Sequence, residues 1–128
     1  MSEQVYAEIN DIRRSNGLRP LRWHDGLAKV ARQHSENMAV NNFFSHTDRQ
    51  GDTALERTQR ARIPFKVVAE NLAWSDGAPD PVAISVDGWM RSPGHRQNIL
   101  RPEVTDTGVG TVRQGNAVYF TQLFIRRP

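Results

Sequence analysis

The segment Asp87–Leu100, which reads Asp-Gly-Trp-Met-Arg-Ser-Pro-Gly-His-Arg-Gln-Asn-Ile-Leu, restricts the fold more than any other part of the chain. A helical pattern of apolar residues ends at Trp89 and Met90, and Ser92-Pro93-Gly94 follows at once. Proline has no N–H and disfavours the α conformation in the residue before it, while glycine tolerates positive φ, so we expect a turn that reverses the backbone here. His95 comes next with polar neighbours on both sides, which is unusual for a core histidine. We therefore predict that the turn holds His95 in one place.

The size and composition indicate one globular domain. The chain has 128 residues, of which 38% are hydrophobic and 24% are charged, and these values argue against disorder. No apolar run is long enough to cross a bilayer, and residues 1 to 20 lack the basic start and apolar core of a signal peptide. We expect no membrane-spanning segment, and the chain is compatible with the mature part of an exported protein.

Cysteine is absent, so a disulfide framework, a thiolate metal site and a cysteine nucleophile are excluded. The net charge is +3, but the basic residues are scattered, with pairs only at Arg13-Arg14 and Arg126-Arg127. Scattered arginines among 14 acidic residues are typical of a solvated surface and not of a phosphate-binding track. We therefore expect no nucleic-acid partner.

Four segments have the periodicity or the capping residues of helices. Residues 2 to 15 carry apolar side chains at i, i+4 and i+7, with Ser2 as a candidate N-cap. A second helix is expected over residues 25 to 41, and a short third helix should begin after Asp52 or Thr53. Asp80 followed by Pro81 predicts the start of a fourth helix, which continues to Met90.

Three segments are expected to form strands. From Phe65 the chain is extended and β-branched, and a strand there would place Glu70 on one face between Val68 and Leu72. Two further strands, residues 107 to 113 and 117 to 125, are joined by Gln114-Gly115-Asn116 and predict a hairpin. The last strand is apolar on both sides, so we place it centrally, with helices covering the faces of the sheet or packing at its edge.

Three polar side chains, His46, Glu70 and His95, are candidates for a functional site, and His34 is a possible fourth. A carboxylate on an apolar face, as at Glu70, must be paired, hydrogen-bonded or open to a cleft. Two roles for Glu70 are equally supported. It could pair with backbone donors or an arginine, or it could face a ligand. His46 lies in a loop after Phe43-Phe44, and the rings favour a positioned over a freely solvated side chain. His34 lies on the apolar face of the second helix. The favoured interpretation is a core histidine that bonds to the backbone, and the alternative is that His34 belongs to the polar site.

Ordered motifs along the chain resemble those of a known family. They are Asn10, Arg13, Leu18, Pro20, Leu21, Trp23, Leu27, Ala31, His34, His46, Ala69-Glu70-Asn71-Leu72-Ala73, Trp89 to Leu100, Gly108-Val109-Gly110 and Tyr119-Phe120-Thr121-Gln122. From about residue 4 to 125 the sequence is similar to the CAP (SCP) domain, which occurs in cysteine-rich secretory proteins, antigen 5 and class 1 pathogenesis-related plant proteins. The Ser-Pro-Gly-His motif and the absence of cysteine are most similar to the short bacterial branch.

The resemblance implies an α/β/α sandwich in which a small antiparallel sheet lies between helix layers. It also implies a central cleft with two histidines and two glutamates, which in some members binds zinc or another divalent cation. Matched by position, the cleft residues are His46, Glu70, Ser92 and His95, and the metal ligands are His46, His95 and Glu70. Ser92 stands where the family has its other glutamate, and a hydroxyl in place of a carboxylate should weaken a cation site.

The resemblance favours a binding or interaction module over an enzyme. The expected protein is secreted, at the cell surface or periplasmic, is a monomer, requires no cofactor, can bind a divalent cation, and has an extracellular lipid, peptide or cell-surface component as its ligand. One alternative is a purely structural cleft with a Glu70–His95 hydrogen-bonded pair, in which case a lipid or peptide binds elsewhere on the domain. Another is a metal-dependent or serine-type hydrolase with Ser45, Ser75 or Ser92 as nucleophile, although no Gly-x-Ser-x-Gly motif occurs.

Overall fold

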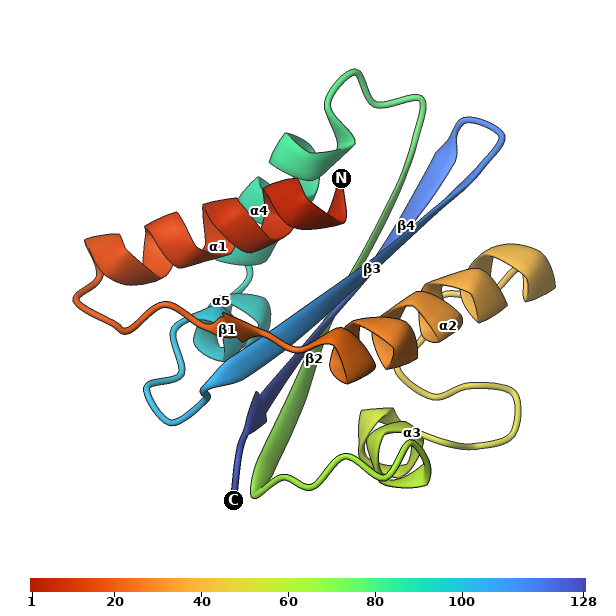
Figure 1. Cartoon of the computed structure of the whole chain (residues 1–128). Helices are drawn as coiled ribbons and strands as arrows, with labels where there is room; N and C mark the ends of the chain where they lie inside the picture. Colours follow the sequence, from red (N-terminus) through yellow and green to blue (C-terminus); the bar gives the residue numbers. More distant parts are fainter.

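The computed structural model describes residues 1–128 as three layers, with a four-stranded sheet between two layers of helices (Figure 1). The strand order is β1-β3-β4-β2. The strands are β1 (Arg22–Trp23), β2 (Val67–Asp76), β3 (Asp106–Gln114) and β4 (Ala117–Arg126). β1 pairs parallel to β3, whereas β2 and β3 both pair antiparallel to β4. The central position predicted for β4 is therefore confirmed, and β2 is an edge strand.

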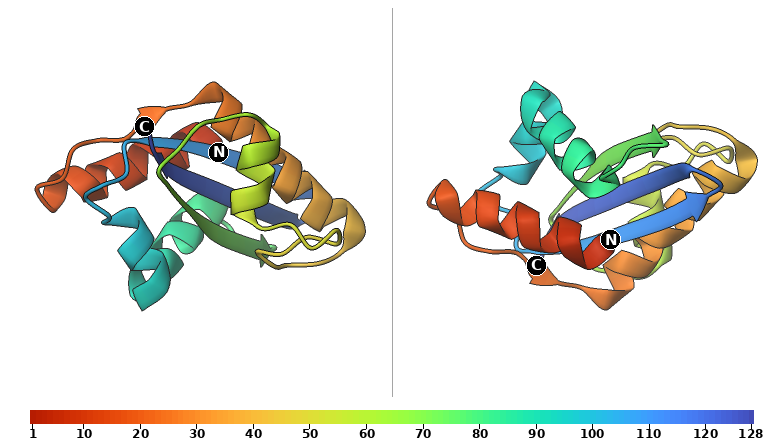
Figure 2. Two further views of the ribbon diagram at one scale, coloured as in Figure 1. Left: turned by 90° about the horizontal axis from the view of Figure 1, so that it is seen from below. Right: turned by 90° about the horizontal axis from the view of Figure 1, so that it is seen from above.

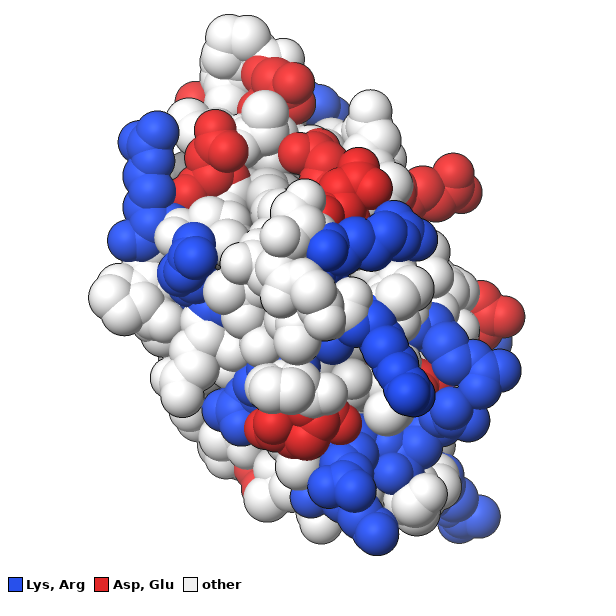
Figure 3. All heavy atoms as spheres, turned by 90° about the vertical axis from the view of Figure 1, so that its left-hand side faces the viewer, with Lys and Arg blue, Asp and Glu red and all other residues white.

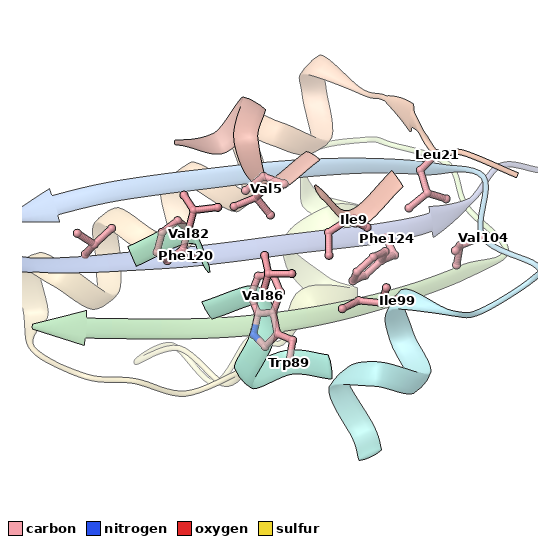
Figure 4. Packing of buried hydrophobic residues seen from close by; sticks show 12 residues of the cluster. Val5, Ile9, Leu21, Val82, Val86, Trp89, Ile99, Val104, Phe120 and Phe124 are labelled. Atoms are coloured by element: carbon pink, nitrogen blue, oxygen red, sulfur yellow. The ribbon is translucent and has the colours of Figure 1, made fainter. Parts of the chain in front are cut away.

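Five helices cover both faces of the sheet (Figures 1 and 2). They are α1 (Ser2–Ser15), α2 (Asp25–Asn41), α3 (Ala54–Arg60), α4 (Pro81–Arg91) and α5 (Pro93–Ile99). One buried cluster joins α1, α4 and α5 to the sheet and includes Val86, Trp89 and Phe120 (Figure 4). A second cluster joins α2 and α3 to the opposite face through Leu27 and Leu123. The predicted α/β/α sandwich is thus observed.

Two glycines of β3 let α2 lie directly on the sheet. A Cβ atom on Gly108 or Gly110 would overlap the backbone of α2, at Ala28 and Arg32 respectively. Val109 between them points to the opposite face and joins the first cluster. The close approach of α2 therefore depends on the absence of side chains at these two positions.

The turn predicted at Ser92-Pro93-Gly94 is wrong. Ser92 is extended, with φ −102° and ψ 120°, and ends α4, but Pro93 occupies the first position of a new helix, α5. Proline is favoured there because its missing N–H would have no partner in the helix and its φ is already helical. Ser2 is likewise the first residue of α1 and Met1 is its N-cap. His95 therefore lies on a helix and not in a loop.

Candidate functional site

Glu70 lies in the middle of β2 and is the centre of a buried ion pair. Its side chain is 3% exposed, and Arg57 Nη1 donates to Oε2 at 2.8 Å while Nη2 donates to Oε1 at 3.2 Å. His46 Nδ1 lies 2.8 Å from Oε1. Burial alone would raise the pKa of Glu70, but hydrogen bonds from His46 and Arg57 and the positive charge of Arg57 hold that pKa below its usual value. The arginine pairing expected for Glu70 is therefore observed.

The ionised carboxylate also determines the tautomer of His46. An ionised carboxylate only accepts hydrogen bonds, so Nδ1 of His46 must carry the hydrogen. In the neutral ring Nε2 then has a free lone pair. The His46 side chain is 56% exposed. The arrangement presents an exposed imidazole whose orientation is set by a buried carboxylate.

Arg57, which no sequence pattern singled out, connects three segments of the site. It lies in α3, whose start is fixed by a capping box in which the Thr53 N–H donates to Glu56 Oε1 at 2.7 Å. Besides Glu70, its guanidinium donates to the carbonyl of His46 at 2.7 Å. Asp48 lies 3.9 Å from its Nε. Arg57 thus joins α3, the loop that carries His46, and β2.

His95 lies on α5, which hydrogen bonds connect to β2. Its Nδ1 is 2.9 Å from Ser92 Oγ, and its carbonyl accepts a hydrogen bond from Asn71 Nδ2 at 3.1 Å. Asn98 Nδ2 donates to Asn71 Oδ1 at 2.9 Å and completes the link between α5 and β2. Burial, and then the nearby His46, lower the pKa of His95. No hydrogen bond joins the two histidines, and His46 acts on His95 through its charge alone.

His34 is a core histidine, as its position on the apolar face of α2 predicts. It is buried, and its Nε2 lies 2.9 Å from the carbonyl of Ser45. Burial, followed by the charge of Arg57, lowers its pKa, so the ring is neutral near pH 7. The bond to Ser45 holds the start of the His46 loop against α2. His34 therefore helps to position the loop that carries His46.

A groove of about 340 Å³ begins at Ser92 and His95 and runs between β2 and α4. Its remaining lining is mostly apolar or aromatic: Phe44, Leu72, Ala73, Trp74, Ser75, Ile84, Ser85, Gly88 and Trp89. Glu70 does not line it, because the carboxylate is covered by His46 and Arg57. Of the four predicted cleft residues, Ser92 and His95 lie at the end of this largely apolar groove, whereas His46 and Glu70 do not line it.

The Glu70–His95 pair expected for a purely structural cleft is wrong. Glu70 bonds to His46, and His95 bonds to Ser92. The candidate nucleophiles differ in their surroundings: Ser45 Oγ accepts from the N–H of Thr47, and Ser75 Oγ is buried without a partner. Ser92 is the one among them whose hydroxyl contacts a histidine ring.

The donor atoms near Glu70 fit a cation only in part. Both carboxylate oxygens are engaged by Arg57 and one also by His46. No group of three histidine, aspartate or glutamate side chains is arranged to hold a metal ion. The remaining donors are the Nε2 atoms of His46 and His95, and a histidine ligand commonly bonds a carboxylate through its other nitrogen, as His46 does.

Charges are unevenly distributed over the surface that Figure 3 shows, with acidic side chains gathered in its upper part and basic side chains below. One acidic group spans α1 and α4, where burial, and then Asp80, Asp87 and Asp11, raise the pKa of Glu8. The groove has no Asp, Glu, Lys or Arg in its lining. The acidic and basic side chains therefore lie outside the groove lining.

Comparison with known proteins identifies the class. Residues 6–124 match the family described as CAP, the cysteine-rich secretory protein family, and the chain belongs to this family. An extracellular Bacillus anthracis protein that contains an SCP domain is 35% identical, with a TM-score of 0.87 over 98% of this chain and 40% of that one. An outer surface protein of Borrelia burgdorferi is 25% identical, with a TM-score of 0.89 over 98% of this chain and 92% of that one.

Among curated proteins, the chain is 38% identical over 127 residues to a Bacillus subtilis (strain 168) protein named "Uncharacterized membrane protein YlbC". The match covers 98% of this chain and 34% of YlbC. The domain thus spans about a third of that relative. No helix of the present structure has the length and apolarity needed to cross a membrane.

Proposed function

We propose that this CAP domain is a binding module of a secreted or cell-surface protein, and that its ligand lies in the groove that ends at His95. The observation that supports a binding role is the exposed His46 imidazole, which the buried Glu70–Arg57 pair holds outside the groove lining. Burying a carboxylate is costly unless it is paired, and Arg57 alone would satisfy that need. The additional bond to an exposed ring is best explained by a ring that must face a ligand in a fixed orientation.

The same site is proposed to bind a divalent cation such as zinc. His46 and His95 would supply imidazole nitrogens, Ser92 or water would complete the set, and Glu70 would orient His46 from behind. Two neutral nitrogens form a weaker site than one that contains a carboxylate ligand, so we expect modest affinity. Binding should weaken as the pH falls and the rings become protonated.

Zinc titration by calorimetry tests this proposal. Heat should be observed with the native domain near neutral pH and should be lost in a His46→Ala, His95→Ala double variant. His24→Asn is the matched control, because His24 caps α2 and asparagine can keep that role. Equal heats from the double variant and the native domain would contradict the assignment of the two ligands.

A hydrolase is the second candidate, and the Ser92–His95 contact favours it. The groove beside this contact could hold a substrate, but no carboxylate is bonded to His95 to orient it as a base. Hydrolysis of ester or peptide substrates by the native domain, and its loss in Ser92→Ala, would establish this activity. A purely structural role instead predicts that His46→Ala and His95→Ala lower the melting temperature without changing any binding.

A further inference from the structure

The free edge of β2 at Trp74 forms one wall of the groove. The groove is lined by the four consecutive residues Leu72 to Ser75. Consecutive strand residues point to opposite faces, so a groove that touches all four runs along the edge of the strand and not over one face. β2 is the last strand of the sheet, and its other side is paired with β4.

The hydrogen bonds of β2 show which backbone groups face this edge. Asn98 Nδ2 donates to the carbonyl of Glu70 at 3.2 Å, and Trp89 Nε1 donates to the carbonyl of Leu72 at 2.9 Å. In an antiparallel pair, residues that bond the partner strand alternate with residues that face away. Trp74 is the next residue of the outward series, and no side chain bonds its N–H or C=O. Side chains cover the edge at Glu70 and Leu72 and leave it open at Trp74.

Exposed apolar side chains are concentrated at this open part of the edge. Six large hydrophobic side chains are exposed in the whole chain, and three of them, Phe44, Trp74 and Ile84, line this groove. The Trp74 ring is stacked on Tyr119, with centroids 6.2 Å apart, and therefore presents a fixed surface. Folded proteins normally cover or charge an open edge, so an open, apolar edge is a surface for pairing.

We propose that the groove binds an uncharged, extended peptide segment, which adds one residue to the edge of β2 by pairing with the N–H and C=O of Trp74. Apolar side chains of the peptide contact Trp74, Phe44 and Ile84, and one end lies at His95. The charge of the lining matches this occupant, since its 11 residues include no Asp, Glu, Lys or Arg. An acyl chain fits less well, because it would cover the Trp74 amide groups without replacing their hydrogen bonds to water.

The inference rests on the proposed binding function, because it names the ligand of that groove, but it does not need a cation. A library of acetylated, amidated hexapeptides built from Val, Ile, Leu, Phe, Ser and Thr is the probe. Binding is measured by fluorescence anisotropy with a chelator and again with added zinc ions. Peptide binding without any effect of zinc would support this inference and contradict the cation proposal. Zinc binding with no peptide selected would contradict this inference and support the cation proposal.

N-methylation at each position of the selected peptide tests the backbone pairing. We expect methylation of the residue opposite Trp74 to weaken binding about tenfold, while methylation of its neighbours is tolerated. Trp74→Ala and Ile84→Asp should weaken binding, and Val40→Ala, which changes an exposed apolar side chain outside the groove, should not. Amide exchange at Trp74 should slow when the peptide binds.

Three outcomes would overturn the proposal: no peptide is selected, no methylation changes the affinity, or the groove variants bind as the native domain does. Displacement of the bound peptide by laurate at equal affinity, together with insensitivity to N-methylation, would identify an apolar pocket for acyl chains instead. Melting temperatures separate loss of binding from loss of fold. Ile84→Asp and Val40→Ala, at exposed side chains, should melt as the native domain does, and Trp74→Ala should lose only its stacking on Tyr119.

Discussion

Replacing Arg57 with methionine should strongly destabilise the domain. The substitution keeps the length and apolar stem of the side chain but leaves the Glu70 carboxylate, whose side chain is 3% exposed, with only His46 as a partner. Removing one member of a buried ion pair costs about 3–5 kcal/mol, and the remaining His46 bond favours the lower value of about 3 kcal/mol. At roughly 3–5 °C per kcal/mol for a domain of this size, the melting temperature should fall by about 9–15 °C.

Arg60→Met is the matched control in the same helix. Arg60 Nη1 lies 2.6 Å from Asp52 Oδ2, so it also forms an ion pair, but its side chain is 69% exposed whereas that of Arg57 is 10% exposed. Exposed pairs contribute about 0–1 kcal/mol. Urea unfolding of both variants near neutral pH gives the comparison. Equal losses of stability would refute the argument that burial makes the Arg57–Glu70 pair important.

The pH dependence supplies a second, independent result for the same variant. In the native domain the pKa of Glu70 is below its usual 4.5, so the stability due to its ionisation is complete above pH 4.5 and is lost as the pH falls through the lowered folded-state pKa. Without Arg57 the effect of burial dominates and the pKa of Glu70 should rise. The difference in unfolding free energy between the two proteins should therefore shrink on acidification. Combining Arg57→Met with Glu70→Gln should recover part of the loss, because no charge remains buried.

Two further substitutions test the packing around the site. Gly110→Ala should lower the unfolding free energy by about 1–3 kcal/mol or more, since its Cβ would overlap the backbone of Arg32. Gly88→Ala is the control, because the space at its Cβ is open and no such cost is expected. Urea titrations of both variants measure the difference. Trp89→Phe should lower the unfolding free energy by about 1–3 kcal/mol, because the carbonyl of Leu72 loses its indole donor. Unchanged amide exchange in β2 would show that this hydrogen bond does not stabilise the strand.

Periodicity and capping residues predicted most of the secondary structure because they act locally. Asp80 and Pro81 begin α4 as expected, with the N–H of Ala83 bonded to the Asp80 side chain at 3.1 Å. Gly115 has φ 63° in the hairpin between β3 and β4, where glycine is favoured. The error at Ser92-Pro93-Gly94 has a local cause too: the same residues are compatible with a turn and with the start of a helix, and the packing of Ile99 in the core favours the helix.

The site could be predicted only in part, because its central contact is not local. The sequence indicated that Glu70 needs a partner, but 17 lysines and arginines were available, and Arg57 differs from Arg60 in no local feature. The capping box at Thr53 is the signal that could have helped, since it fixes the start of α3 and so places Arg57 near the buried Ala54 and Thr58 on the inward side. The strand that this side of α3 faces is determined by the tertiary fold, so the pairing of Arg57 with Glu70 could not be read from local sequence.

The charge balance of the site explains why the apolar groove should dominate recognition. Arg57 neutralises Glu70, and Ser92 stands where the family resemblance implies a second glutamate, so no uncompensated carboxylate remains beside His46 and His95. A cation would then be held without a carboxylate ligand, while a peptide along β2 would gain both apolar contact with Trp74 and backbone hydrogen bonds at the open edge. Ser92→Glu should accordingly strengthen zinc binding and affect the peptide only at the end that lies at His95, so that the pairing at Trp74 is kept. If Ser92→Glu changed both affinities equally, the two ends of the groove would form one site and the separation of cation from peptide recognition would be wrong.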